Sequence, residues 1–143
     1  MKIRINELLK IIKTVFKMKN LITCSVCSFT TKWTDCDYTT YILNKGIEGI
    51  ATCIVNYYGD NKKQAYLWNL QVKEEYRKRG IASQLIDKVC QDAKIRGCEE
   101  ISLEWEAEES DGWVLDWYKR LGFKVDFEEK DTPFSIILVK KLK

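Results

Sequence analysis

The 143-residue sequence contains no histidine, and this absence excludes several kinds of active site. Hydrolases of the Ser-His-Asp or Cys-His type need an imidazole, and histidine is also the usual general base near neutral pH. A zinc site built on the clustered cysteines Cys24, Cys27 and Cys36 would lack a fourth ligand. The remaining cysteines lie in apolar patterns typical of a core, so we predict no metal site and no cysteine nucleophile.

The sequence also lacks an apolar run of the ~20 residues needed to span a bilayer. The N-terminus does not have the layout of a secretory signal. The net charge is only +3, and lysines alternate with glutamates along much of the chain, which argues against a nucleic-acid partner. We therefore predict one cytoplasmic domain over residues 1–143, with neither a nucleic-acid nor a membrane partner.

An amphipathic helix is predicted near the N-terminus, because apolar residues recur at helical spacing from Glu7 to Met18 with lysines between them. Asn6 is the expected helix cap. A basic amphipathic helix can lie on a membrane surface, but packing against the core of its own domain is commoner. We predict the second arrangement. Residues 20–37 give no clear pattern.

The rest of the chain predicts an α/β (α+β) fold with a mixed, mostly antiparallel twisted sheet flanked by helices. Strand 65–72, helix 81–96 and strand 100–106 form a β-α-β unit, which requires a right-handed crossover and parallel pairing. The other predicted elements are strands 38–43 and 49–58, a helix from 111 to 121, and a hairpin of strands 123–127 and 134–139 with its turn near 131–133.

A basic turn, Arg77-Lys78-Arg79-Gly80-Ile81-Ala82, joins strand 65–72 to helix 81–96. The free N–H groups at a helix start attract anions, and the small residues Gly80 and Ala82 let an anion approach the backbone. The dinucleotide fingerprint and the nucleotide P-loop are both absent. We therefore predict a phosphate or pyrophosphate site, with a solvated basic loop as the alternative.

Arg77-x-x-Gly80-x-Ala82 resembles the acetyl-CoA signature Q/R-x-x-G-x-G/A of the GNAT N-acetyltransferase family. A second stretch, residues 117–123 (Trp-Tyr-Lys-Arg-Leu-Gly-Phe), resembles the family's L-Y-x-x-x-G-F motif, with Trp where Leu is usual. Asp111 and Val114 stand where the family often has Asn and Ala. The two motifs occur in the family's order with one strand between them, and the resemblance covers roughly residues 38–140.

The resemblance implies the acyl-CoA N-acyltransferase fold, with acetyl-CoA as co-substrate. It implies that the backbone of residues 70–72 pairs with the pantetheine arm and polarises the thioester carbonyl, although Leu70 and Val72 could equally be core residues. The residues expected to bind acetyl-CoA are Leu70, Gln71, Val72, Arg77, Lys78, Arg79, Gly80, Ile81, Ala82 and Asp111.

By the same resemblance, the hydroxyl of Tyr118 protonates the departing thiolate; the alternative is an aromatic side chain that merely packs. The residues alone leave open which group accepts the proton of the amine. Glu104, Glu106 or a water molecule held by Asn69 could serve, and we take Glu104 as the catalytic candidate.

Tyr66 and Trp68 are expected to share a face of their strand with Val72 and to line the acceptor pocket together with Asn69 and Glu106. The acidic run that begins at Glu104 would favour a cationic amine, although a solvated acidic loop explains it equally well.

These features predict an acetyl-CoA-dependent N-acetyltransferase. It would move acetyl to the primary amine of a small molecule or peptide by direct attack in a ternary complex. One alternative is a non-catalytic CoA-binding sensor or interaction module of the same fold. Another is a basic adaptor for nucleic acid or membrane, based on the lysine-rich segment 10–19 and the basic turn.

Overall fold

The computed structural model describes residues 4–107, 110–128 and 135–142, which form a seven-stranded sheet in the order β1-β2-β3-β4-β5-β7-β6. Only β4 and β5 pair in parallel, so the predicted mixed, mostly antiparallel sheet is confirmed. The turn predicted near 131–133 lies outside the described residues. The elements are α1 (Ile5–Asn20), β1 (Ile22–Thr30), β2 (Asp37–Lys45), β3 (Glu48–Tyr58), η1 (Asp60–Lys62), β4 (Gln64–Val72), η2 (Glu74–Tyr76), α2 (Ile81–Ile95), β5 (Glu100–Glu106), α3 (Gly112–Arg120), β6 (Lys124–Glu128) and β7 (Ser135–Lys141).

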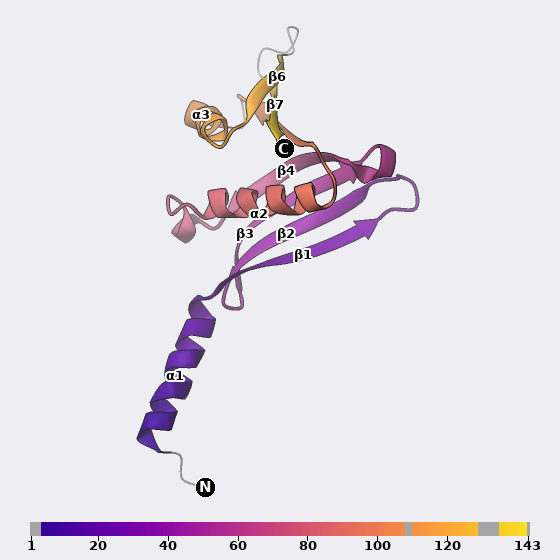
Figure 1. Ribbon diagram of the computed structural model, residues 1–143. Helices are drawn as coiled ribbons and strands as arrows, with labels where there is room; N and C mark the ends of the chain where they lie inside the picture. The colour runs from indigo at the N-terminus through magenta and orange to yellow at the C-terminus, as the bar shows by residue number, and fades with distance from the viewer. Residues whose placement is uncertain (1–3, 108–109, 129–134, 143) are drawn as a thin grey trace.

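Helix α2 covers one face of the sheet (Figure 1). Its apolar stripe packs on alternate residues of the strands, among them Tyr41, Leu43, Val55 and Leu67, all of them buried. Gly97 adopts φ 92° directly after the helix, as expected of a glycine that ends a helix. The buried stripe consists of Ile81, Leu85, Ile86, Val89, Cys90 and Ala93.

The structure separates two of the clustered cysteines. Cys24 pairs with Leu43 and Cys27 with Thr40, so these two thiols lie on opposite faces of the sheet. No cluster of potential metal ligands occurs within the ranges that the structure describes. The cysteines predicted to be core residues, Cys53, Cys90 and Cys98, are buried.

Helix α1 departs from the prediction. It begins at Ile5 with Arg4 as its N-cap residue, not Asn6, and none of its residues is buried. Figure 1 shows α1 extending away from the sheet at the start of β1. The predicted packing of α1 against its own core is therefore wrong. Only Leu21 separates the helix from the edge strand β1, and the helix leaves that edge pointing away from the core. None of the described helices is long and apolar enough to cross a membrane.

A bulge in β4 overturns a second prediction. Next to Asn69, which adopts φ 54°, two residues of β4 face one residue of β3. The extra residue reverses which side chains point to which face. Val72 therefore lies on the α2 face, whereas Tyr66 and Trp68 lie on the opposite face, contrary to the expectation that all three share one.

Strands β4 and β5 diverge soon after they meet. Their described pairs are Ala65 with Ile101 and Tyr66 with Ser102. Beyond Tyr66, β4 keeps its ladder with β3 but has no partner on the β5 side among the described residues. This opening in the sheet leaves the β5 side of the β4 backbone without a strand partner, between helices α2 and α3.

Candidate functional site

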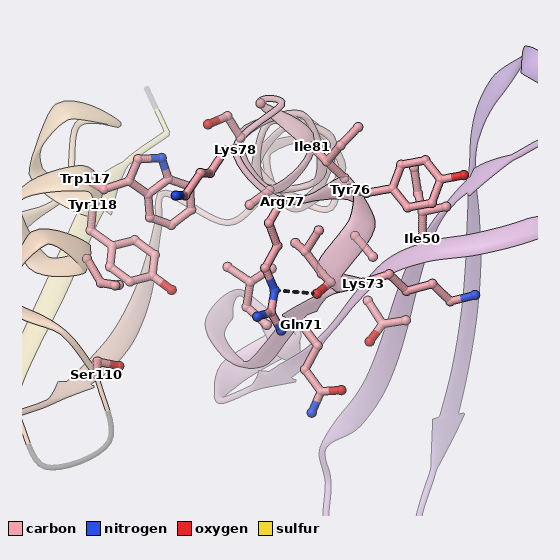
Figure 2. A pocket seen from close by; sticks show the side chains of 18 of the residues that line it. Ile50, Gln71, Lys73, Tyr76, Arg77, Lys78, Ile81, Ser110, Trp117 and Tyr118 are labelled. Atoms are coloured by element: carbon pink, nitrogen blue, oxygen red, sulfur yellow. Dashed lines mark hydrogen bonds between the residues drawn. The ribbon is translucent and has the colours of Figure 1, made fainter.

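The turn after β4 is held by local hydrogen bonds. The N–H of Tyr76 donates to the carbonyl of Lys73 at 2.9 Å, and the N–H of Arg77 donates to that of Glu74 at 3.1 Å. Arg77 Nε donates to the carbonyl oxygen of Val72 at 3.0 Å, as Figure 2 shows. The guanidinium group thus ties the turn back to the end of β4.

The start of α2 presents a group of free N–H donors. Lys78 and Gly80 adopt φ 60° and φ 74°, so the chain turns sharply before the helix begins. Within the described chain, no acceptor is bonded to the amides of residues 78–83. Successive free amides at a helix start form an anion-binding concavity. A Cβ added at Gly80 would meet nothing within 4 Å, so the space beside these amides is open.

A cavity of about 910 Å³ lies between this turn, the ends of β3 and β4, and α3. It brings together nearly all the residues predicted to bind the cofactor. The exception is Arg79, whose guanidinium group lies 5.8 Å from the ring centroid of Tyr76 and does not line the cavity. The predicted residues that do line it are Leu70, Gln71, Val72, Arg77, Lys78, Gly80, Ile81, Ala82 and Asp111.

Tyr118 is fixed by the end of α3. Gly122 adopts φ 99°, and the N–H of Phe123 donates back to the carbonyl of Tyr118 at 3.1 Å. This turn places the buried Phe123 ring edge-on to Tyr118, with 5.6 Å between centroids. The glycine and phenylalanine of the second motif thus have a packing role: they orient the tyrosine.

The hydroxyl of Tyr118 points into the cavity from the α3 side (Figure 2). Its side chain is 9% exposed, and no described residue accepts or donates a hydrogen bond at its oxygen. Burial, followed by the nearby Cys53, raises the pKa of Tyr118 to about 12. The hydroxyl is therefore protonated at neutral pH and available as a donor.

A second cavity of about 470 Å³ lies at the opening between β4 and β5. It is lined by every residue predicted for the acceptor side: Tyr66, Trp68, Asn69, Glu104 and Glu106. It shares part of its wall with the first cavity, and Tyr118 belongs to that shared wall. The two cavities therefore share a wall formed by Leu70, Gln71, Ser110 and Tyr118.

Polar contacts fix the side chains of this second cavity. Trp68 Nε1 donates to Asn56 Oδ1 at 2.8 Å, and the Ser135 hydroxyl donates to Glu104. Burial, followed by the negative charges of Glu104 and Glu106, raises the pKa of Tyr66. The cavity thus combines aromatic surface with negative charge, a lining suited to an ammonium group.

Some lining residues were missed from the sequence. Trp113 and Trp117 line the larger cavity from α3, and Ser83 lines it from α2. Trp113 Nε1 donates to Asp111 Oδ2 at 3.3 Å, so the carboxylate at the N-cap of α3 is already engaged there. The four-residue spacing of the two tryptophans was an available signal, because such residues share a helix face.

The buried thiols do not supply a nucleophile. Burial raises the pKa of Cys53 to about 12 and raises the pKa values of Cys90 and Cys98. A thiol with a raised pKa is almost entirely protonated at neutral pH, and the thiolate is the reactive form. That no cysteine acts as nucleophile stays a prediction, which the environment of these three thiols supports.

Comparison with known proteins places this site in a family. Residues 6–123 match the model of the acetyltransferase (GNAT) family. Over 67 residues the chain is 42% identical to N-alpha-acetyltransferase MAK3 of Arabidopsis thaliana. That match covers 46% of the chain and 34% of the relative, so the chain spans about a third of the curated relative's length.

Solved structures share the fold. A GNAT family acetyltransferase of Elizabethkingia anophelis with acetyl-CoA bound superposes with a TM-score of 0.62 at 16% identity, covering 82% of this chain and 97% of that one. The NatC complex bound to Gag peptide and CoA gives a TM-score of 0.59 at 23% identity, covering 73% and 71%. The family model extends over more than half of the sequence, and the chain belongs to the acetyltransferase (GNAT) family.

Proposed function

We propose that this chain is an acetyl-CoA-dependent N-acetyltransferase. It moves acetyl from the thioester to a primary amine by direct attack in a ternary complex. The observation that carries the proposal is that Tyr118 lines both cavities, at the place where β4 and β5 diverge. One cavity suits a long anionic cofactor and the other a cationic acceptor, and a transfer reaction needs both to reach one point.

The residues present fit acetyl-CoA. The free amides of residues 78–83 would hold its pyrophosphate, supported by the cationic side chain of Lys78 at the cavity wall. The backbone of residues 70–72, which has no strand partner on its β5 side in the described chain, would pair with the pantetheine arm and donate to the thioester carbonyl. Acetyl-CoA, when bound, supplies an acetyl group that is already activated as a thioester.

Two side chains would then act in proton transfer, one as donor and one as acceptor. Tyr118, protonated at neutral pH, would donate to the sulfur as the thiolate departs. Glu104, held by Ser135 and facing Tyr66, would accept the proton of the ammonium group directly or through water. With these roles no covalent bond between the acetyl group and the enzyme is needed.

The acceptor that we propose is a cationic primary amine. Glu104 and Glu106 supply negative charge, and Tyr66 and Trp68 supply aromatic surface, on the walls of the second cavity. The MAK3 relative is an N-alpha-acetyltransferase, which supports the α-amine of a peptide N-terminus as the acceptor. Small polyamines present the same chemical group, so both acceptor classes enter the test.

The test is free-thiol release from acetyl-CoA by the full chain, with a panel of small cationic amines and short peptides. We expect thiol release that depends on one class of amine, with an acetylated product of matching mass. If acetyl-CoA binds in calorimetry but no amine increases thiol release, the chain is instead a non-catalytic CoA-binding module of the same fold.

A further inference from the structure

Helix α1 carries a full apolar face that no described part of the chain covers. Its apolar residues share one face and are 46% to 76% exposed, while Lys10, Lys13 and Lys17 lie on the opposite face. An isolated helix of this length is only marginally stable in water. The apolar face therefore calls for a partner surface. It consists mainly of Leu8, Leu9, Ile11, Ile12, Val15 and Phe16.

A second uncovered surface lies on the sheet face opposite α2, which we call the open face. It is formed by alternate residues of four strands: 23–29 of β1, 38–44 of β2, 52–58 of β3, and 66, 68 and 71 of β4. None of these residues is charged, although 31% of the chain is. Phe29, Tyr58 and Trp68 are 58%, 39% and 39% exposed. A charge-free face with exposed aromatic residues is typical of an interface.

The helix cannot cover the open face of its own chain without breaking its junction with the sheet. A single residue, Leu21, separates α1 from β1. The N–H of Gly46, in the β2–β3 turn, donates to the carbonyl of Leu21 at 2.9 Å. A Cβ on Gly46 would lie 2.6 Å from the carbonyl oxygen of Lys19, so the turn is packed directly against the end of the helix. These contacts direct α1 away from its own sheet.

We propose that two copies of this chain associate by placing α1 of each on the open face of the other. The arrangement has twofold symmetry: α1 of the first copy packs on the open face of the second, and α1 of the second copy packs on the open face of the first. The helix has 16 residues and is roughly 24 Å long, which matches strands of roughly 30 Å. Two such contacts would bury on the order of 2,000 Å², enough for a stable dimer.

The dimer would also complete the acceptor side of the site. Tyr66 and Trp68 belong both to the open face and to the wall of the second cavity. A partner helix on this face would therefore lie beside the entrance for the amine. The lysines of α1 would also suit an anionic lipid surface, but a membrane would leave the charge-free open face unexplained.

The test uses sedimentation of the full chain over a concentration series. We expect the wild type to sediment as a dimer. Ile12→Lys places a charge at the centre of the helix face, and Ile54→Lys places one at the centre of the open face. Each should weaken association by roughly a hundredfold, because a lysine would be buried in the contact. Thr14→Lys, which adds the same charge on the polar side of α1, should leave the dimer intact.

Mixing the two variants separates the proposal from simple misfolding. The Ile54→Lys chain has an intact helix and the Ile12→Lys chain an intact open face, so a mixture regains one of the two contacts. We expect dimers in the mixture and monomers in each variant alone, with far-ultraviolet circular dichroism confirming that both fold. Should Ile54→Lys fail to fold, Phe29→Lys at the edge of the open face takes its place.

Three results would overturn the proposal. These are a monomeric wild type, folded variants whose mixture stays monomeric, and a monomer that floats with phosphatidylserine vesicles through α1. The last result would assign the helix to a lipid surface instead.

Discussion

Tyr118, the proton donor that we propose, shows how neighbouring residues can orient a single side chain. Gly122 reverses the chain, Phe123 returns against the ring, and the tyrosine side chain lines both cavities. The surrounding apolar residues also keep the phenol protonated, because burial disfavours the charged phenolate. One aromatic position thus has its orientation and its protonation state set by packing.

Tyr118→Phe should lower kcat about a hundredfold or more, with little change in acetyl-CoA affinity, because it removes a proton donor and almost no volume. Since burial raises the pKa of Tyr118 to about 12, the hydroxyl stays protonated as pH rises from 7 to 10. The ratio of wild-type to variant kcat should therefore stay constant over that range. A ratio that falls toward one above pH 9 would show that the donor ionises earlier than this.

Single residues also show which local conformations could be predicted from the sequence and which could not. The glycines at 80, 97 and 122 were predictive, because each occupies a conformation that other residues adopt at a cost. Asn69 also has a positive φ, but asparagine occurs in many turns and caps, so its presence did not indicate a bulge. That one conformation moved Val72 to the other face of the sheet.

At the scale of elements, helix α2 is joined to the sheet by a polar cluster as well as by its apolar stripe. The Tyr41 hydroxyl lies within hydrogen-bond reach of Asp92 on α2 and of the Tyr57 hydroxyl. Arg96 Nε donates to Asp92 at 3.0 Å, and its guanidinium group lies 4.4 Å from the Tyr57 ring centroid. This cluster secures the C-terminal end of the helix whose N-terminal end forms the proposed anion site.

Asp92→Ala should lower the free energy of unfolding by about 1–3 kcal/mol, because it leaves the buried Tyr41 hydroxyl and Arg96 without their shared acceptor. Asp87→Ala, an exposed carboxylate on the same helix, should change it by less than about 0.5 kcal/mol. Urea denaturation followed by fluorescence measures both. Equal effects of the two substitutions would contradict the role given to the cluster.

Helices with a strong apolar periodicity could be predicted from the sequence, but the surfaces against which they pack could not. Helix α2 has an apolar stripe and a terminal glycine, and its predicted bounds of 81–96 differ from the observed ones by one residue. The same periodicity found α1, but it could not say what the apolar face packs against. Strand β1 was missed because it lies at the edge of the sheet with both faces largely exposed. Such a strand does not need alternating apolar and polar residues, so the sequence carried no strand pattern.

At the scale of the whole molecule, charge is distributed between the two sides of the site. The larger cavity, which we propose for the cofactor, is lined by Arg77 and Lys78, and the smaller one, proposed for the acceptor, is lined by Glu104 and Glu106. A net charge of +3 conceals this separation. Opposite fields at the two entrances would guide an anionic cofactor and a cationic amine to opposite sides of Tyr118.

Glu106→Gln should raise KM for a cationic amine about fivefold while leaving acetyl-CoA affinity unchanged, because it removes one attractive charge from the acceptor side. The difference from wild type should shrink as salt screens the interaction. Glu100→Gln removes a charge from the same strand outside the cavity and should leave KM unchanged. Steady-state kinetics at two salt concentrations measures both effects. An equal change in KM for the two substitutions would contradict the acceptor assignment.

The central claim is that the pyrophosphate of acetyl-CoA binds the free amides at the start of α2. Calorimetric titration of acetyl-CoA into Gly80→Glu tests it most directly, with Gln91→Glu as a control that adds the same charge farther along the helix. The account predicts binding at least about a hundredfold weaker in Gly80→Glu, because bulk and negative charge enter the anion site, and wild-type binding in the control. Wild-type affinity in a folded Gly80→Glu variant would contradict it.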